Sequence, residues 1–539
     1  MLYESCTPSR SLASELESIS ARIDSFLAKR SWVPLLVISA VFLLFASLKA
    51  RRGMLWFDEV LTYYISALPD FHEMWNAVLN HAEAGSPFSD FVAKLSGQIF
   101  GRNTFGLRFP EIIGYLTMML CVYAIVRRYA SPLYAMVGAL AGFLTYAPFY
   151  AVEARPYGLL LGLSSIALLF WEEAWHTSSW QAKVGLFASL MLAVFVHYYA
   201  VFTVAAIGAA ELVRSWQRRR MDWLTWFVLV SSAAPLLYFL PLIRANTAML
   251  DGGYAPATLS NFVDMTTFFY LPGSGIFWAL LAVVTVVSIL TFGMRELPTA
   301  TEDDTPQPHD YAAWGAFLLT PLWVFVVGKL FTGSFHSRYG VITVIGFSIL
   351  LPLCLQRLFH ASRSAVLAEL LVLAVGFYVW CTHSYITERQ LENTRADLSE
   401  WMESSKGSQL PILVANPIMY LPLAATANNL RDLVIYTPDA GEAVRYHRAS
   451  TADVTLLGLE RIAPLNMPTF SEFTKSHRRF LVLWEDSPFD WVVPKLKDMG
   501  AELRVCGTFE SKMLLQVDLP DGRTNTGAEI ALDPACTRK

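Results

Sequence analysis

The chain has 539 residues, of which 54% are hydrophobic and 16% are charged, whereas about 25% charged residues is typical of soluble proteins. Its 41 Lys and Arg are balanced by 45 Asp and Glu, a formal net charge of −4, which excludes nucleic-acid binding through phosphate contacts. The 14% of aromatic residues excludes a disordered polymer. The composition predicts a membrane protein.

Long apolar stretches follow one another through the first 385 residues. A helix needs about 20 mainly apolar residues to cross the hydrocarbon core, where every backbone group must find a partner within the protein. The sequence predicts a polytopic α-helical membrane protein with about 11 transmembrane helices. The eleven stretches are, within a few residues, 32–50, 108–126, 132–152, 156–175, 182–197, 199–215, 223–243, 275–293, 311–330, 338–356 and 364–385.

Clusters of Lys and Arg in short loops favour the cytoplasmic side of a membrane. Arg127-Arg128, Arg218-Arg219-Arg220 and Arg357 fall in alternate loops, which places the N-terminus in the cytoplasm. The odd number of spans then places everything after about residue 386 outside. Three cations just after the first span oppose this assignment, but the later clusters outnumber them: Lys49, Arg51 and Arg52.

Three regions follow from this topology: a cytoplasmic N-terminal amphipathic segment (1–31), a transmembrane domain (32–385) with a long outer loop (51–107), and an extracytoplasmic domain (386–539). In the first, apolar residues recur at helical spacing, which fits a helix on the inner membrane surface; a frayed tail is the alternative. In the outer loop, 69–81 and 87–100 are predicted helices, the second with Asp90 opposite its apolar stripe.

The last region has the composition of a soluble domain, and its predicted strands alternate with helices. This pattern predicts a small α/β domain. It has no phosphate-binding glycine loop, so we expect it to recognise or stabilise rather than to catalyse. A disulfide between Cys506 and Cys536 is one hypothesis, and two free thiols are the alternative. The predicted strands are 410–415, 433–436, 479–484, 502–509 and 513–517, and the predicted helices are 417–427 and 488–499.

Charged residues gather where predicted spans meet the outer surface. Inserting a charged side chain into the membrane costs about 2.5–3.5 kcal/mol, so charges kept at this boundary indicate a functional role. Asp58-Glu59 follows the first span beside Trp56-Phe57. A carboxylate at an apolar boundary suits the removal of a proton from an attacking hydroxyl, although an acidic helix start is the structural alternative.

Four further segments reach the same rim. Arg155 could hold a phosphate by two parallel hydrogen bonds, or form a local pair with Glu153. His197 could be a ligand or a satisfied buried group, Arg338 a ligand or a snorkelling helix end, and Arg108 is predicted to be such an anchor. These residues occur in Glu153-Ala154-Arg155-Pro156-Tyr157, His197-Tyr198-Tyr199, His336-Ser337-Arg338-Tyr339 and Leu107-Arg108-Phe109-Pro110.

Together these motifs resemble the C-type membrane glycosyltransferases that use polyprenyl-phosphate sugars, in the branch of the protein O-mannosyltransferases and the lipid A aminoarabinose transferase. Two departures stand out: Ala84-Gly85-Ser86-Pro87-Phe88 replaces the Pro-Pro motif common in the first loop, and the Trp-Trp-Asp signature of oligosaccharyltransferases is absent. The resemblance covers about residues 1–385, through Phe57-Asp58-Glu59, the run from Phe100 to Pro110, Glu153-Ala154-Arg155-Pro156-Tyr157, His197-Tyr198 and Arg338-Tyr339.

The resemblance implies a glycosyltransferase that moves a monosaccharide from a polyprenyl phosphate to a hydroxyl of a lipid, glycan or protein, with inversion, at the outer face of a bacterial inner (plasma) membrane. Asp58 would be the general base, with Glu59 and Glu153 as further catalytic carboxylates. Whether a divalent metal takes part is open. Donor-phosphate contacts would be Arg155, His197 and Arg338, and further substrate contacts would be Tyr157, Tyr198, His336 and Tyr339.

The main alternative is a transporter or flippase of a lipid-linked saccharide, and a third reading is a non-catalytic assembly factor. A transporter would favour charges near the bilayer midplane and broken helices in paired halves, whereas here the charges cluster at one surface.

Overall fold

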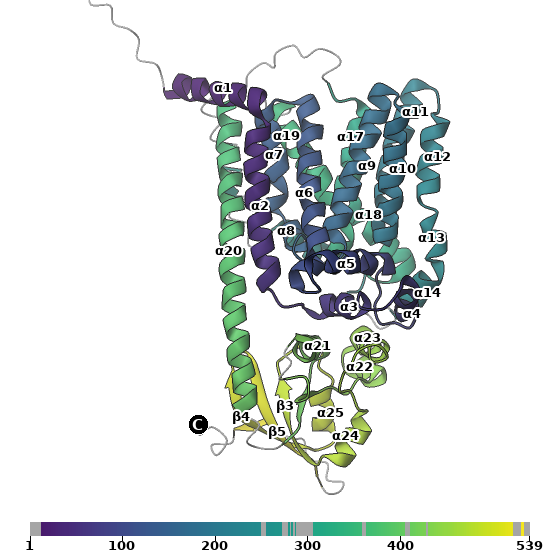
Figure 1. The fold of residues 1–539 in the computed structure, drawn as a ribbon, viewed down its shortest axis with the longest axis vertical. Helices are drawn as coiled ribbons and strands as arrows, with labels where there is room; N and C mark the ends of the chain where they lie inside the picture. The colour runs from purple at the N-terminus through teal and green to yellow at the C-terminus, as the bar shows by residue number, and fades with distance from the viewer. Residues whose placement is uncertain are drawn as a thin grey trace, which may run out of the picture.

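The computed structural model describes residues 12–249, 255–271, 279–280, 282–283, 286, 305–357, 363–404, 410–426, 430–520 and 530–532. A bundle of upright helices forms one part of the molecule, and an α/β region lies beyond one end of it (Figure 1). Three short helices lie across that end, between the bundle and the α/β region; we call them the cap layer: α3 (Phe57–Ile65), α4 (Phe71–Leu79) and α5 (Pro87–Phe100).

The bundle confirms a helical protein with several membrane spans. Among the described residues, 4 helices are long and apolar enough to cross a membrane, or up to 6 if each of two bent pairs is one span. The predicted number of eleven stays a prediction, and 275–293 lies almost wholly outside the described residues. The long bundle helices are α2 (Trp32–Arg52), α6 (Thr104–Tyr129), α9 (Tyr157–Thr177), α10 (Trp180–Val196), α11 (Val201–Arg218), α19 (Thr343–Arg357) and α20 (Arg363–Ser404).

Several predicted spans are broken before they reach the cap layer. Prolines begin or closely follow many of the breaks, because proline lacks the N–H that continues a helix. Broken backbone is tolerated at membrane depth where protein surrounds it. The pieces are α7 (Pro132–Ala141), η1 (Gly142–Leu144) and α8 (Ala147–Tyr150); α12 (Trp223–Ser232), α13 (Pro235–Tyr238) and α14 (Leu240–Met249); and α17 (Pro308–Leu318), α18 (Thr320–Val327) and η5 (Gly328–Thr332).

Helices α6 and α9 pack with their backbones in contact. A Cβ on Gly114 would lie 2.3 Å from the Gly158 carbonyl oxygen, and one on Gly162 would lie 2.6 Å from that of Gly114. Small residues four apart allow such close approach in membrane bundles. The contact fixes the ends of these two helices, which lead into the cap layer, relative to each other.

Helix α5 covers the predicted residues, but its buried face differs from the expectation. Asp90, Ala93 and Ser96 are buried, whereas Leu95 and Ile99 of the predicted apolar stripe are exposed. The Ser96 hydroxyl donates to the Gly106 carbonyl oxygen at 2.5 Å. The helix therefore turns small and polar side chains toward the bundle and leaves apolar side chains at the rim, where a membrane surface would meet them.

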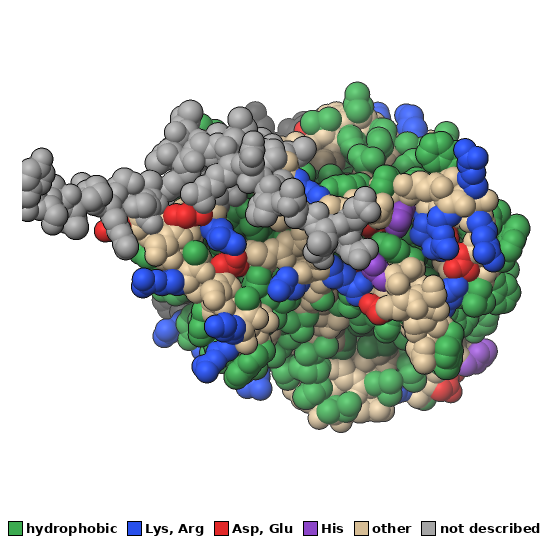
Figure 2. All heavy atoms as spheres, turned by 90° about the horizontal axis from the view of Figure 1, so that it is seen from above, with side chains coloured by type: hydrophobic (Ala, Val, Ile, Leu, Met, Phe, Trp, Pro, Cys, Tyr) green, Lys and Arg blue, Asp and Glu red, His purple; other side chains and the backbone are tan. Residues whose placement is uncertain are grey.

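Helix α1 (Leu12–Arg30) lies across the opposite end of the bundle from the cap layer (Figure 1). Asp24 accepts hydrogen bonds from the Leu133 backbone N–H at 3.3 Å and from Arg363 Nε at 3.1 Å. Residues 12–30 are thus a docked helix rather than a frayed tail. The surface at this end shows many Lys and Arg side chains (Figure 2), and α6 and α11 both end in arginines.

The α/β region confirms the predicted fold class. Helix α20 runs unbroken past residue 386 into this region, where the Trp401 ring lies 5.7 Å from that of Phe509. Among the described residues, six strands form one mixed sheet of order β2-β1-β3-β5-β4-β6. The elements are β1 (Ile412–Val414), α21 (Pro417–Thr426), β2 (Val434–Ile435), α22 (Ala440–His447), α23 (Thr451–Leu459), α24 (Phe470–Ser476), β3 (Arg479–Trp484), α25 (Val492–Asp498), β4 (Glu502–Phe509), β5 (Lys512–Asp518) and β6 (Ile530–Leu532).

The cap layer and the α/β region share one hydrophobic core. Val60 and Ile65 of α3 belong to the same buried cluster as Tyr420 and Leu421 of α21. Burial of this cluster removes apolar area from water and fixes the α/β region against the cap layer. Cys536 lies outside the described residues, so its pairing with Cys506 stays a prediction.

Candidate active site

Residues far apart in the sequence meet at the cap layer. Asp58 is the second residue of α3, and Arg338 lies in η6 (Ser337–Gly340). Arg338 Nη1 donates to Asp58 Oδ2 at 2.8 Å, and their side chains are 13% and 17% exposed. The carboxylate is therefore paired with a cation but still reachable, as an acid–base group must be.

Glu59 is held differently from its neighbour Asp58. Its buried carboxylate accepts hydrogen bonds from Arg108 Nε and Nη2, both at 2.6 Å, and from the backbone N–H groups of Ala154 at 2.6 Å and Trp56 at 3.2 Å. This arrangement ties the start of α3, the start of α6 and the turn before α9 together. Glu59 is thus placed as a brace between three segments.

Arg108 is buried, not a snorkelling anchor as the sequence predicted. Besides Glu59, its guanidinium donates to the carbonyl oxygens of Met54 at 2.7 Å, Gly53 at 2.9 Å and Ala50 at 3.2 Å. Five N–H donors in a planar fork allow one side chain to satisfy so many acceptors. No local sequence pattern indicates this partner, because 49 positions separate Arg108 from Glu59.

Arg155 pairs with a residue that sequence analysis missed. Its Nη1 donates to the Glu83 carboxylate and, at 3.3 Å, to the carbonyl oxygen of Asp58. Glu83 is buried, and burial raises its pKa while the Arg155 charge lowers it. The local Glu153–Arg155 pair is not among the ion pairs of the described residues. Glu83 lies just before Ala84–Phe88, the segment that replaces the family's Pro-Pro motif. This position was the sequence feature that could have pointed to Glu83 as a site residue.

Asp90 of α5 lies near Glu83 and is completely buried. Burial, followed by repulsion from Glu83, raises the pKa of Asp90 well above its ordinary value, and Arg155 opposes this shift. Two carboxyl groups beside one arginine favour a state in which one of them keeps its proton. Asp90 is then a neutral acid next to the Glu83–Arg155 pair.

Glu153 is a further buried carboxyl group of the site, beside Glu59, Glu83 and Asp90. Burial raises its pKa well above the ordinary value; repulsion from Glu59 adds to the shift, and the charge of Arg338 opposes it. A protonated Glu153 is a hydrogen-bond donor rather than a base.

His197 and His336 occupy equivalent positions at the starts of two 3₁₀ turns, η2 (Tyr198–Ala200) and η6. His197 Nδ1 accepts from the Tyr199 N–H at 3.1 Å, and His336 Nδ1 accepts from the Arg338 N–H at 3.3 Å. Burial lowers the pKa of each imidazole to about 3; the charges of Arg155 and Arg338 add to the shift at His197, and that of Arg338 adds to it at His336, where Asp58 opposes it. Both rings are therefore neutral, with the proton on Nε2.

Aromatic rings connect these turns. The Tyr199 ring stacks on Tyr339 at 4.7 Å, and the Tyr157 ring lies 5.4 Å from His197. Tyr198 points elsewhere: its hydroxyl donates to the Gly85 carbonyl oxygen at 2.9 Å, which holds the Ala84–Phe88 motif. Thus Tyr157, His336 and Tyr339 join the charged cluster, whereas Tyr198 supports the loop beside it.

Comparison with known proteins decides the class. Residues 82–239 match the family model of dolichyl-phosphate-mannose-protein mannosyltransferase, a segment that includes Glu83, Arg155 and His197. No curated protein matches the sequence. The chain is a membrane glycosyltransferase that is similar to this family over the matched segment. Both the predicted resemblance and the predicted enzyme class are confirmed.

Two structures of ArnT share the fold of this glycosyltransferase. ArnT from Cupriavidus metallidurans bound to undecaprenyl phosphate has a TM-score of 0.55 and 16% identity, covering 90% of this chain and 98% of that chain. The apo state of the same protein has a TM-score of 0.53 and 14% identity, covering 91% and 98%. The oligosaccharyltransferase of Archaeoglobus fulgidus with zinc and sulfate has a TM-score of 0.41 and 12% identity, covering 87% and 72%.

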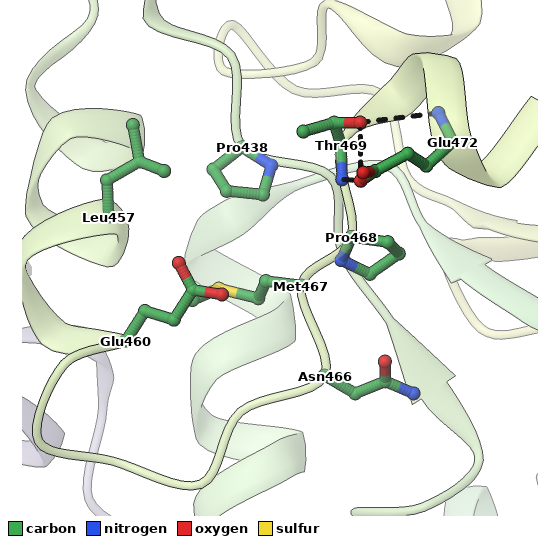
Figure 3. Close-up of a pocket in the computed structure, with 8 residues that line it drawn as sticks. All are labelled: Pro438, Leu457, Glu460, Asn466, Met467, Pro468, Thr469 and Glu472. Atoms are coloured by element: carbon green, nitrogen blue, oxygen red, sulfur yellow. Dashed lines mark hydrogen bonds between the residues drawn. The ribbon is translucent and has the colours of Figure 1, made fainter.

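The glycosyltransferase has a hollow in its α/β region, away from the Asp58–Arg338 pair. A cavity of about 400 Å³ lies beside α23 and the start of α24, with Glu460 and Met467 on one side and Pro438 and Leu457 on another (Figure 3). Glu472 at its edge accepts a hydrogen bond from the Thr469 hydroxyl at 2.7 Å. Among the described residues, no three His, Cys, Asp or Glu side chains group closely enough to hold a metal ion.

Proposed function

We propose that the enzyme transfers one sugar from a polyprenyl phosphate to a hydroxyl acceptor, with inversion, using Asp58 as the general base. The observation that carries this proposal is the Asp58–Arg338 pair, which joins a reachable carboxylate to a cation beside a second arginine, Arg155. The ArnT structure with undecaprenyl phosphate supports a donor of this kind.

In the proposed displacement, these residues account for the proton removed and for the charge that forms on the leaving group. Asp58 takes the proton of the acceptor hydroxyl, whose oxygen attacks C1 of the sugar; the C1–O bond to phosphate breaks, and polyprenyl phosphate leaves with the electron pair. Arg338 and Arg155 stabilise the negative charge on the departing phosphate. A donor phosphate that draws Arg338 away from Asp58 would also free the carboxylate to accept the proton.

The remaining candidate residues take supporting parts in this proposal. Glu153 and His197 donate neutral hydrogen bonds to the acceptor or to the phosphate, and Tyr157, His336 and Tyr339 line the same space. Glu59, saturated by Arg108 and two backbone N–H groups, positions Asp58 rather than reacting itself. Tyr198 acts through the loop that it holds.

The proposed topology has the cap layer and the α/β region outside an inner (plasma) membrane and α1 in the cytoplasm. The arginines at the ends of α6 and α11 support it, since they lie toward the α1 end. Lys49 and Arg51 lie near the Phe149 and Phe105 rings, at 5.5 and 4.9 Å, a placement that aromatic contacts stabilise on the cap side.

A transporter of lipid-linked saccharides is the second candidate, because two bent helix pairs resemble the discontinuous helices of transporters. Purified wild type, Asp58→Asn and the control Asp264→Asn, an exposed carboxylate of α15 (Leu259–Tyr270), should be compared with a panel of labelled polyprenyl-phosphate sugars, water and simple hydroxyl acceptors, with and without divalent metal. Transfer by wild type and the control but not by Asp58→Asn supports the proposal. Wild-type activity in Asp58→Asn would overturn the base assignment, and lipid flux without transfer would favour transport.

A further inference from the structure

Helix α23 of the α/β region touches the backbone of the turn that follows α4. A Cβ on Gly458 would lie 2.5 Å from the Asn80 carbonyl oxygen and 2.6 Å from the Ala82 nitrogen. Real Cβ atoms do not approach backbone atoms so closely, because such distances lie inside van der Waals contact. Only glycine allows the two backbones to meet without moving one of them.

A second contact from the α/β region reaches this turn. Arg461, which follows α23, donates from Nη1 to Asn80 Oδ1 at 2.6 Å. His81 between the contacts has φ of 69°, the left-handed conformation common just after a helix C-cap. The end of α4 stabilises it, because the His81 N–H donates to the Val78 carbonyl oxygen and the Ala82 N–H to the Ala77 carbonyl oxygen, both at 3.0 Å. The α/β region therefore meets a turn of defined shape.

The constrained turn leads directly into the active site. Ala82 and Glu83 are buried, and Glu83 binds Arg155, whose Nη1 also donates to the Asp58 carbonyl oxygen. Between the contact with Gly458 and the carboxylate of Glu83 there is a single residue step along the chain. A displacement of the turn therefore reaches the arginine that we assign to the donor phosphate.

We propose that Gly458 and Arg461 are positioning residues for the donor-phosphate site. By fixing residues 80–82, the α/β region sets Glu83 against Arg155, although it contributes no group to the reaction. This inference rests on the proposed function for its kinetic part. It assigns the α/β region a mechanical part in donor binding.

The first test measures the turn without using activity. Hydrogen–deuterium exchange across residues 77–86 should be compared in full-length wild type, Gly458→Ala, Arg461→Ala and the control Gly441→Ala, where the added Cβ would meet the nearest atom only at 3.4 Å. Faster exchange in Gly458→Ala and Arg461→Ala, but not in the control, supports the inference. Exchange equal to that of wild type in both variants overturns the inference, and this result does not depend on any assay of sugar transfer.

The second test separates positioning from general loss of fold. In Gly458→Ala and Arg461→Ala, KM for the polyprenyl-phosphate sugar should rise between about tenfold and a hundredfold, as expected when a binding group is misplaced. KM for the acceptor and the melting temperature should stay close to those of Gly441→Ala. Equal losses in every parameter, in proportion to unfolded protein, would indicate a structural contact alone.

A double-variant comparison checks the route. Asn80→Ala removes the partner of Arg461, so Asn80→Ala combined with Arg461→Ala should raise the donor KM no further than either change alone. Additive effects would mean that Arg461 acts through another contact, which would contradict the proposed path.

Discussion

Arg338 Nη1 lies 2.8 Å from Asp58 Oδ2, although 280 positions of sequence separate the two residues. The proposed base and a proposed phosphate ligand are thus partners of each other. In the proposed mechanism, a donor phosphate that takes Nη1 of Arg338 takes it from Asp58, so the pair would couple donor binding to release of the carboxylate.

The coupling predicts the behaviour of Arg338→Gln. We expect a higher KM for the donor, because a charge-assisted hydrogen bond to phosphate is lost, and a lower kcat, because the departing charge is less stabilised. The double variant with Asp58→Asn should lose less than the sum of the single changes, with a coupling of about 0.5–3 kcal/mol. Steady-state kinetics of the four proteins measure this, and strict additivity would show that the pair has no role in turnover.

The Glu59–Arg108 pair should contribute to folding more than to chemistry. Removing one partner leaves an unpaired buried charge, so Arg108→Met is expected to destabilise the protein by about 3–5 kcal/mol. Glu59→Leu combined with Arg108→Met should recover part of this loss, because no buried charge remains. Thermal unfolding in lipid nanodiscs tests the order of the variants; a stable but inactive Glu59→Gln protein would instead point to direct catalysis by Glu59.

Asp90 predicts a distinct pH dependence. Its raised pKa means that the folded protein holds a proton that the unfolded chain releases near pH 3.8, so stability is present below that value and declines as pH rises toward the folded pKa. Asp90→Asn, a neutral side chain of similar shape, should remove this decline and keep activity, whereas Asp90→Ala should weaken the Glu83–Arg155 pair. Unfolding measured across pH distinguishes them, and identical pH profiles for wild type and Asp90→Asn would contradict a protonated Asp90.

The two active-site histidines predict the opposite trend. Their pKa values near 3 mean that the folded state disfavours the charged rings, so stability is complete above pH 6.5 and declines as pH falls from 6.5 toward 3. His197→Asn and His336→Asn can still accept the backbone N–H and should flatten this decline. Melting temperatures between pH 7 and pH 4 give the comparison; a ring found protonated at pH 6 by NMR would disprove neutrality.

Local sequence patterns predicted much of the fold. Ser86-Pro87 marks the start of α5, because serine caps the helix and proline suits its first turn, and the apolar runs of β3 and β4 end where predicted. The buried face of α5 was not predictable in this way. Asp90 looks like a solvent-facing residue until Glu83 and Arg155 surround it.

By itself, the sequence determined that this chain is a helical membrane protein with an α/β region, because hydrophobic length and strand alternation are local properties. The order of its motifs also indicated the glycosyltransferase class. Only the tertiary structure decided the partners: Glu59 with Arg108, Glu83 with Arg155 and Asp58 with Arg338, which are 49, 72 and 280 positions apart. Such pairs depend on where helices cross and where breaks occur, and burial then fixes which groups keep their charge.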